Sequence, residues 1–584
     1  MKDNLLIKIY VTTLCIFITT FSSAQNLDKI GEKGMVKVSG GLNFNTISYA
    51  SDGIAFPSRE PFTWFATGNI NVSILDVALP FTYTYSNQGG QYIQPFNQTA
   101  LHPSYKWVQT HVGNVNMSFS PYTLSGHTFL GGGVELTPGK WKFKLMGGRL
   151  NKAVNYNSQD DNLNQIVFKR YGFGVSAGYN NKGYSGEIIL FKGVDDKNSL
   201  NFIPLNTEVK PQDNFVASIV GKAKIIKNLN LTAEYALSGL TQNTNNSNIA
   251  DVDQQLSFMN NIINANSTTD FFNAFKTSLA YKLKFMNLAF NFEHVDPGYK
   301  TLGGYYFNND LQNYTLAPSF TLLKNKLNIG LNTGYQINNL AGDKSSTTNR
   351  WVGSINASYA PNKSLNFVGS YSNFSTYTRN RPNTDPFYYQ PADTMNFYQL
   401  SQNAMASVGY RFGEGKNKSA LQLMYNYQES YNLSGNILDA SAFGINVETN
   451  TTPSNVHASN LSYSLQFTEH AASVTFAANA NYTSFLTTQS LFVGPTLNLQ
   501  KSLFEKKSSL SIGSTYNRQY SSSELVSNVF NHRISFSFAP KIENKKAGKV
   551  NLSLNANLMQ RLPTGSSLTK ITELNVFANM AYSF

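Results

Sequence analysis

The sequence ends on NVFANMAYSF (575–584), a stretch in which apolar side chains recur at every second position. One parity carries Val576, Ala578, Met580, Tyr582 and Phe584, whereas the other parity is mostly small or polar. Side chains alternate faces along a β-strand, so the stretch predicts a strand with one apolar face and one wetter face. The fold then depends on the medium that each face meets.

The same alternation recurs along the chain, for example in LPFTYTY (79–85), LAYKLKF (279–285) and ISFSF (534–538). No segment shows the pattern of a convincing amphipathic helix. A soluble sandwich would bury the apolar faces in a core, whereas a membrane barrel would turn them to lipid. Individual strands do not distinguish these two folds.

Composition favours a barrel in a membrane. Charged residues make up only 14% of the chain and aromatic residues 13%, with a mean hydropathy of −0.28. Soluble globular proteins have about 25% charged residues. Beyond the N-terminus no apolar run reaches the roughly 18 residues that a membrane-spanning helix needs, which excludes a bundle of such helices.

The lengths of the links between strands are more specific. Short turns near 180–183, 227–228, 324–326, 361–364, 468–471 and 504–507 alternate with long polar loops at 86–106, 241–270, 295–311, 337–349, 374–395 and 432–453. A membrane barrel has short turns at one face and long loops at the other. We therefore predict an all-β fold, a single large transmembrane antiparallel up-and-down β-barrel over residues 25–584.

We predict about 24–26 strands, because single-chain bacterial barrels have even strand numbers. The stretch 107–149 is the one in which the alternation of link lengths breaks. Strand-like alternation begins at Val36, soon after the N-terminal segment. That leaves no room for the N-terminal plug domain that a TonB-dependent transporter carries, so no plug is expected.

The N-terminus predicts export. Lys2 and Lys8 precede the apolar stretch VTTLCIFITTF (11–21), and Ser22 and Ala24 fit the small-x-small rule for a signal peptidase site. We predict that residues 1–24 are a signal peptide, cleaved between Ala24 and Gln25. Cys15, the only cysteine, lies within it, so the mature chain would have no disulfide. Lipidation of Cys15 is the less favoured alternative, since Leu14 precedes it.

The chain end also carries a resemblance. A terminal aromatic residue after alternating apolar positions (Phe584, Tyr582, Met580, Ala578 and Val576) resembles the last strand that the barrel-assembly machinery recognises. With the signal peptide, the chain is similar to outer-membrane β-barrel proteins. Its charge-poor, tyrosine-rich composition and the stretches 95–107, 120–129 and 296–311 resemble those of an uncharacterised group of large Bacteroidota barrels. The resemblance implies outer-membrane lipid and the assembly machinery as partners, and no established activity.

The predicted function is a porin-like channel or transport conduit for an unknown solute. The alternative is a barrel that serves as a scaffold or accessory subunit of a surface export, assembly or adhesion machinery. Barrels wider than porins have lumens that need a plug, so inward loops or a protein partner should fill this one. The candidate inward loops are 120–127, 241–270 and 374–395.

Enzyme chemistry is not predicted. The seven histidines show no metal-ligand spacing, and no nucleophile elbow, phosphate loop or EF-hand loop is present, so no cofactor is expected. The acid pairs in 159–161 and 194–198 fit either ordinary loop carboxylates or, less favoured, a calcium site. The net charge of +13 sits mainly in short turns rather than in a continuous patch, so nucleic acid is not an expected partner.

In a membrane barrel, the chemistry of arginine and aromatic side chains predicts which face of the wall, or which rim, they occupy. An arginine facing lipid at mid-membrane costs roughly 2–4 kcal/mol, so strand arginines should face the lumen or lie near a rim. These arginines are Arg149, Arg170, Arg411, Arg518 and Arg533, with Arg379 and Arg381 in a long loop. We favour internal pairing with Asp and Glu, or extension of the side chain to the membrane interface, over a lumen field that attracts anions. The aromatic residues Trp64, Phe65, Trp107 and Trp141 are predicted to form girdles at the membrane interfaces.

Overall fold

The computed structural model describes residues 36–584 apart from several gaps. The gaps are 56–58, 88–96, 158–165, 205–206, 208, 249–261, 305–307, 343–348, 374–399, 431–453, 486–487, 541–547 and 566–568. The predicted signal peptide and its cleavage site at Ala24 and Gln25 lie outside the described residues. Within the described part, no helical segment has the length and hydropathy of a membrane span.

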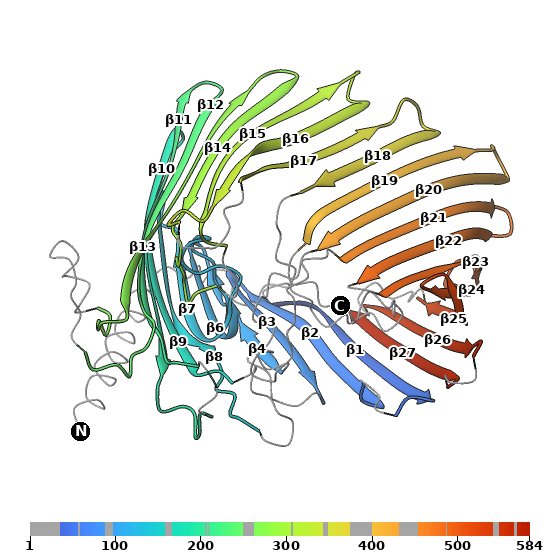
Figure 1. Cartoon of the computed structure of the whole chain (residues 1–584), viewed down its shortest axis with the longest axis horizontal. Coiled ribbons are helices and arrows are strands. Elements are labelled where there is room, and N and C mark those ends of the chain that lie inside the picture. Colours follow the sequence, from blue (N-terminus) through green and yellow to red (C-terminus); the bar gives the residue numbers. More distant parts are fainter. Residues whose placement is uncertain are drawn as a thin grey trace.

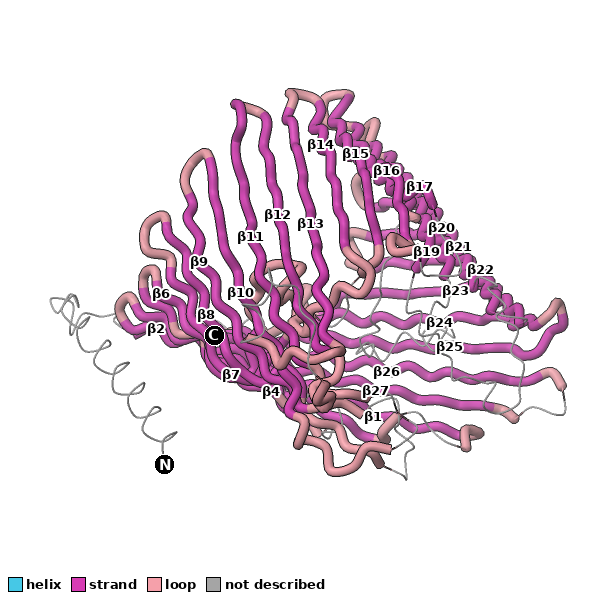
Figure 2. The backbone as a smooth tube through the Cα atoms, turned by 60° about the vertical axis from the view of Figure 1, so that its left-hand side comes forward, coloured by secondary structure: helices cyan, strands magenta, loops and turns pink. Residues whose placement is uncertain are grey.

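All regular structure in the described residues is β-strand, as Figure 2 shows. The strands are β1 Val36–Asp52, β2 Phe62–Ile74, β3 Val77–Ser86, β4 Gln98–Leu101, β5 Ser104–Tyr105, β6 Val108–Asn116, β7 Thr128–Leu136, β8 Trp141–Asn151, β9 Lys169–Asn180, β10 Tyr184–Asp196, β11 Asp213–Ile226, β12 Leu229–Thr241, β13 Thr269–Lys282, β14 Met286–Val295, β15 Leu311–Leu322, β16 Leu327–Asn338, β17 Asn349–Tyr359, β18 Leu365–Ser372, β19 Leu400–Phe412, β20 Asn417–Ser430, β21 Ser454–Phe467, β22 Ala472–Phe485, β23 Thr488–Leu503, β24 Ser508–Ser521, β25 Glu524–Phe538, β26 Lys549–Pro563 and β27 Ile571–Ser583.

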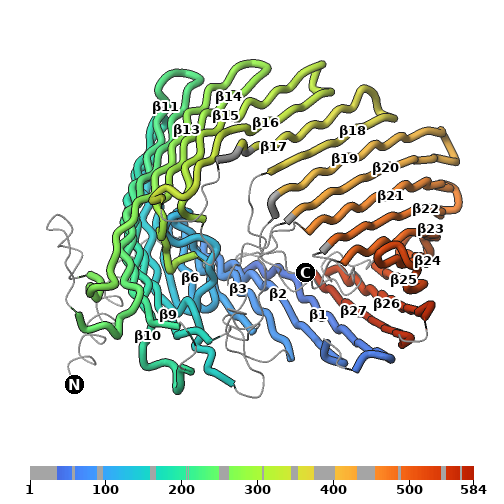
Figure 3. The backbone as a smooth tube through the Cα atoms, viewed as in Figure 1, coloured from blue at the N-terminus to red at the C-terminus, as the bar shows by residue number. Residues whose placement is uncertain are grey.

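The strands form one closed antiparallel ring (Figure 1). Each strand pairs with its neighbours in sequence, except that β4 and β5 both pair with β3 and β6 rather than with each other. The first strand, β1, pairs with β27 over twelve register positions from Gly41–Ser583 to Asp52–Thr572. Figure 3 shows the blue first strand beside the red last strand. The Gly40 and Phe584 backbones exchange N–H···O bonds of 2.9 and 3.0 Å at this seam. No sheet edge is left unpaired at the seam.

The ring contains 26 strand positions, because β4 and β5 share one position between β3 and β6. The register is continuous across the interruption, with Leu101 opposite Val112 and Ser104 opposite Gln109. Proline has no backbone N–H to donate, and both Pro103 and the facing Pro80 stand at the break. The even count agrees with the predicted 24–26 strands. However, the interrupted strand lies inside 86–106, which the sequence predicted to be a loop.

Link lengths follow the predicted alternation through most of the chain. One end of the ring, here called the turn end, carries the links 75–76, 106–107, 137–140, 181–183, 227–228, 283–285, 323–326, 360–364, 413–416, 468–471, 504–507 and 539–548. The other end, the loop end, carries 53–61, 87–97, 117–127, 152–168, 197–212, 242–268, 296–310, 339–348, 373–399, 431–453, 486–487, 522–523 and 564–570.

The prediction that the alternation breaks within 107–149 was wrong. In that stretch a long link at the loop end (117–127) is followed by a short link at the turn end (137–140). The rhythm breaks instead near the C-terminus, where links 486–487 and 522–523 at the loop end are short and link 539–548 at the turn end is long. These links join β22 to β23, β24 to β25, and β25 to β26.

Exposure identifies the two faces of the wall. On β9, exposed Tyr171, Phe173 and Val175 alternate with buried Gly172, Gly174 and Ser176. Residues opposite each other in a β-ladder share a face. The pairing of each strand with the next therefore shows which residues of every strand lie on the same face as those of β9. The exposed set belongs to the outer face, and the buried set belongs to the lumen face, where loop residues cover it.

Candidate functional site

Two loops from the loop end fold into the lumen and meet there. They are residues 117–127, between β6 and β7, and residues 296–304, between β14 and β15, here called the inward loop pair. Leu124 and Gly303 form an isolated parallel β-bridge, and the Tyr299 hydroxyl donates to the Tyr122 carbonyl at 2.8 Å. The green loop after β14 thus reaches the blue β6 and β7 region within the ring (Figure 1).

The first loop packs against the lumen faces of β6–β10. An apolar cluster there includes Met117, Leu124, Phe129, Met146, Leu150 and Phe191, with Phe119 against it. Small residues on the wall make this approach feasible: a Cβ at Gly174 would lie 3.2 Å from the Phe119 ring, and a Cβ at Gly193 would lie 2.7 Å from the Leu302 Cβ. The lumen face is therefore shaped to hold these loops.

The second loop is anchored to β11–β13. Asn214 is fully buried; its Nδ2 donates to Ser238 Oγ at 2.8 Å and to the Gly239 carbonyl at 2.9 Å. Its Oδ1 accepts from the Leu302 N–H at 3.0 Å. The Ser238 hydroxyl donates to the Lys300 carbonyl at 2.7 Å. Buried polar groups are thus satisfied across the interface between loop and wall.

The first loop also spans the lumen to β14. The Tyr122 hydroxyl donates to Glu293 Oε1 at 2.7 Å, and the Tyr122 and Tyr299 rings meet edge-on with centroids 6.1 Å apart. Burial raises the pKa of the Tyr122 hydroxyl far above its usual range, so it stays protonated as a donor. We call the lumen faces of β6–β14, with the inward loop pair on them, the packed wall.

Replacing Asn214 by alanine is expected to lower the free energy of unfolding by about 1–3 kcal/mol, because the Leu302 N–H and the Gly239 carbonyl lose a buried partner. Equilibrium refolding titrations in lipid vesicles measure this difference. Asn230→Ala is the control, since Asn230 lies exposed on the same lumen face of β12. Equal effects at the two positions would contradict the anchoring role of Asn214.

The three candidate inward loops have different outcomes. Residues 120–127 lie in the lumen as described above, and 374–395 falls outside the described residues. For 241–270 the inward prediction is wrong in the described part. Ile263 packs against Phe215, Leu237 and Phe271, which share the outer face with the exposed residues of β11–β13.

A polar network fixes this outer fold. Asp213, fully buried, accepts from the Asn264 N–H at 3.1 Å and from Asn264 Nδ2 at 2.6 Å. Its other carboxylate oxygen lies 3.1 Å from Lys192 Nζ. Lys192 and Asp213 sit on the outer parity of β10 and β11, so the strand ends hold the segment outside the ring.

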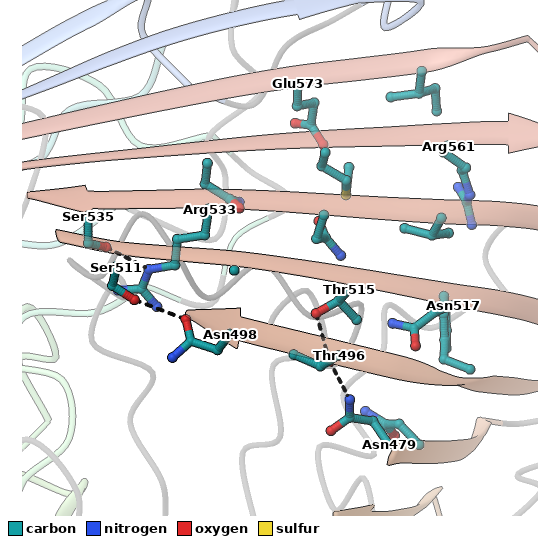
Figure 4. Close-up of a pocket in the computed structure, with 18 of the residues that line it drawn as sticks. Asn479, Thr496, Asn498, Ser511, Thr515, Asn517, Arg533, Ser535, Arg561 and Glu573 are labelled. Atoms are coloured by element: carbon teal, nitrogen blue, oxygen red, sulfur yellow. Dashed lines mark hydrogen bonds between the residues drawn. The ribbon is translucent and has the colours of Figure 1, made fainter. Parts of the chain in front are cut away.

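The opposite side of the lumen is polar. A hollow of about 900 Å³ runs along the lumen faces of β22–β27, here called the polar wall (Figure 4). Asn479 Nδ2 donates to Thr496 Oγ1 at 2.7 Å, and Thr496 and Thr515 hydroxyls lie 2.8 Å apart. Ser511 Oγ donates to Asn498 Oδ1 at 2.9 Å. The lumen thus has one side filled by loops and one side lined by amides and hydroxyls.

The strand arginines divide between the two faces. Arg170 forms a bidentate pair with Asp195 on the lumen face, at 2.7 and 3.0 Å, as internal pairing predicts. Arg411 and Arg533 also face the lumen. Arg149 and Arg518 lie on the outer parity near the loop end, where a rim position was expected. Arg379 and Arg381 lie outside the described residues.

The four tryptophans lie on the outside of the ring near its ends. Trp64 and Trp351 are near the loop end, with Trp351 71% exposed. Trp107 lies in a turn, and Trp141, which stacks on Phe143 at 5.9 Å, starts β8 at the turn end. Phe65 departs from the prediction, because its register partners Asn45 and Ser86 place it on the lumen face.

The predicted C-terminal signal occupies the outer parity of β27. Val576, Ala578, Met580 and Tyr582 face outward, and the Tyr582 and Phe584 rings stack with centroids 5.5 Å apart. Met580 is 51% exposed. The structure therefore locates these residues at the seam and on the outside, and their role in assembly stays a prediction.

No group of three or more histidine, cysteine, aspartate or glutamate side chains in the described residues has the arrangement of a metal site. In the acid pair of 194–198, Asp195 is paired with Arg170 and Asp196 with Lys169 at 2.9 Å. Residues 159–161 lie outside the described part. Sequence spacing missed one contact, between His102 and His111, whose Nδ1 atoms are 2.8 Å apart.

No family model matches the chain, and no curated protein matches it. Among solved structures it is similar to the P pilus usher (PapC) translocation pore, with 9% identity over 93% of this chain and 98% of that chain, at a TM-score of 0.39. It is also similar to a BenF-like porin from Pseudomonas fluorescens Pf-5, with 8% identity, 94% and 99% coverage and a TM-score of 0.30. At these scores and identities, we draw neither family nor activity from the likeness.

Proposed function

We propose that the chain is an integral β-barrel of a bacterial outer membrane and acts as a porin-like channel or transport conduit. The observation that carries the proposal is the orientation of the wall, which turns apolar side chains outward all around the ring and polar side chains inward on β22–β27. A soluble barrel would have the reverse arrangement, with its apolar side chains packed inside.

The exterior supports a lipid environment. Leu145, Phe173, Leu423 and Met580 are 56%, 55%, 48% and 51% exposed on the outer face. Soluble monomers rarely expose apolar patches beyond a few hundred Å². Tryptophans near both ends match the aromatic girdles of membrane barrels.

The interior supports passage of a solute. The inward loop pair occupies the packed wall, and the polar wall opposite it remains a hollow of about 900 Å³ lined mainly by uncharged hydrogen-bonding groups. Hydrated solutes exchange hydrogen bonds with water for hydrogen bonds with such a surface. An off-centre path along the polar wall follows from this division.

Export and assembly complete the proposal. Residues 1–24 would direct secretion, with cleavage between Ala24 and Gln25. Phe584, Tyr582, Met580, Ala578 and Val576 would engage the barrel-assembly machinery, and their common outward parity supports this role. A source among the Bacteroidota is part of the same proposal and rests on the sequence resemblance alone.

The second candidate is a scaffold or accessory subunit of a surface machinery. The inward loop pair favours it, because a lumen that is partly filled need not conduct. A stable protein partner recovered from native membranes, together with a closed lumen, would be its signature.

The proposal is tested by fractionating cells that express the chain or a variant lacking Phe584, then reconstituting the purified protein in planar bilayers. We expect the full chain in the outer membrane, most of the folded protein lost without Phe584, and steady ion conductance. Phe584→Tyr is the matched control for assembly. Recovery in a soluble fraction would overturn the barrel proposal, and an outer-membrane protein without conductance would favour the second candidate.

A further inference from the structure

Charge is distributed unequally between the two sides of the lumen. On the packed wall, acidic and basic side chains occur together: Glu135, Glu187, Asp195, Glu234, Asp270 and Glu293 with Lys142, Lys144, Arg170, Lys222, Lys224, Lys276 and Lys282. Some of them form ion pairs, such as Lys276 with Glu293 at 3.7 Å. The field of this wall is therefore largely cancelled at short range.

The rest of the lumen is basic. Among the described side chains of β15–β27 and β1–β5, the charged ones on the lumen parity are Lys37, Arg411, Lys418, Arg533, Lys549 and Arg561, with Glu573 and, in a hairpin at the loop end, Glu524. A wall lined by one sign of charge concentrates the opposite ions near it.

Two of these arginines line the hollow of the polar wall (Figure 4). Arg561 donates to Gln519 Oε1 at 2.6 and 3.0 Å and to Ser527 Oγ at 3.4 Å, so its hydrogen-bond partners in the described part are neutral. Arg533 donates to Ser535 Oγ at 3.3 Å. The nearby Glu573 accepts from the Tyr49 hydroxyl at 2.5 Å.

The spacing of the two arginines suits a path rather than a single pocket. Arg533 lies opposite Asn557 and Arg561 lies four residues further along β26. At about 3.4 Å per residue, the two positions are roughly 14 Å apart along the wall. Between and beside them lie neutral amides and hydroxyls, among them Asn498, Thr515 and Asn557, which line the same hollow.

We propose that the polar wall is a binding path for anionic, hydroxyl-bearing solutes, with Arg533 and Arg561 as two successive sites for a carboxylate or phosphate group. The inference rests on the proposed channel function and names its solute class. Guanidinium groups suit both anions, because their paired N–H donors match carboxylate and phosphate oxygens. Amides and hydroxyls along the wall serve the hydroxyl groups of the solute.

The test uses the purified full chain in planar bilayers under a potassium chloride gradient. We expect a reversal potential showing preference for chloride, and the double variant Arg533→Gln/Arg561→Gln should reduce the chloride-to-potassium permeability ratio roughly two- to fivefold. Arg518→Gln is the matched control, since Arg518 lies on the outer face and bonds to Tyr516; it should leave the ratio unchanged. A preference for potassium, or an equal effect of Arg518→Gln, would overturn the inference.

Solute chemistry is tested in the same bilayers. Added glucuronate should reduce the chloride current more than glucose at equal concentration, and the double variant should abolish this difference. Inorganic phosphate in a third arm separates phosphate from carboxylate recognition. Equal block by glucuronate and glucose would contradict an anion path.

A separate measurement keeps the two proposals distinguishable. Binding of glucuronate to the detergent-solubilised protein is followed by calorimetry, with the double variant and Arg518→Gln beside it. Binding that the double variant loses, in a protein that passes no current, would retain the anion site and reject the channel. Current without anion preference or glucuronate binding would retain the channel and reject the anion path.

Discussion

The double variant Leu124→Asp/Leu302→Asp is expected to raise single-channel conductance at least about twofold, because the lumen of so large a barrel is wide once its filling is released. Both leucines are fully buried within the inward loop pair and the packed wall. Burying an unpaired carboxylate in these apolar surroundings is strongly unfavourable, so the two substitutions are expected to release the loops from the packed wall. Planar-bilayer recordings of the purified variant measure the change.

Ile263→Asp is the matched control for this variant. Ile263 is 3% exposed and likewise receives a buried carboxylate, one rather than two, but its segment packs on the outer face of the ring. Its conductance should equal that of the unaltered chain. The milder variant Leu302→Ala covers the outcome that the double variant does not fold. Unchanged conductance in folded variants, or an increase in Ile263→Asp as well, would contradict a lumen filled by the loop pair.

Replacing Leu423 by arginine is expected to destabilise the barrel by about 2–4 kcal/mol in lipid, the cost of an arginine on the lipid face near mid-membrane. Leu423 is 48% exposed near the middle of β20, and its register partners are Val408 and Leu461. Equilibrium folding titrations in vesicles give the free energy of unfolding of each variant.

Gln422→Arg places the same charge one residue away, on the lumen face of the same strand, opposite Gly409 and Ser462. There the guanidinium meets water and polar side chains, so little change in the free energy of unfolding is expected. A large loss for Gln422→Arg with none for Leu423→Arg would mean that the two faces have been assigned the wrong way round.

The strand pattern was predictable where alternation is clean. The apolar parity predicted in 575–584 matches the outer face of β27, where Met580 is exposed. The stretch 86–106 was not predictable as a strand, since its prolines and glycines have the composition of a loop. There the register of β3 and β6 holds the chain extended across Pro103 despite its missing N–H.

The side to which a loop folds could not be read from the loop itself. Residues 120–127 and 262–265 both carry buried apolar side chains, yet one segment lies inside the ring and the other outside. The difference resides in the walls. On β9, the positions between Tyr171, Phe173 and Val175 are Gly172 and Gly174, which are small rather than polar. Glycines at strand positions that face the lumen therefore indicate that a loop packs against that part of the wall.

The candidate site shows the same limit. Single arginines in strands were visible in the sequence, but whether each finds a carboxylate depends on the register between adjacent strands, which the sequence alone does not define. Arg170 meets Asp195 across one ladder, whereas Arg561 meets Gln519, which lies on β24, two positions away around the ring. The register of the closed sheet therefore determines which arginines bond to a carboxylate and which bond to a neutral side chain.

The seam between β1 and β27 has a consequence for biogenesis. Gly40 and Phe584 are hydrogen-bonded neighbours on the first and last strands of the ring, so β1 waits for its second partner until β27 has been synthesised. Contacts of such long sequence separation form late and slowly. Until then the nascent sheet has two open edges, each a template for wrong pairing. The ring can therefore close only when β27 is present to pair with both β26 and β1.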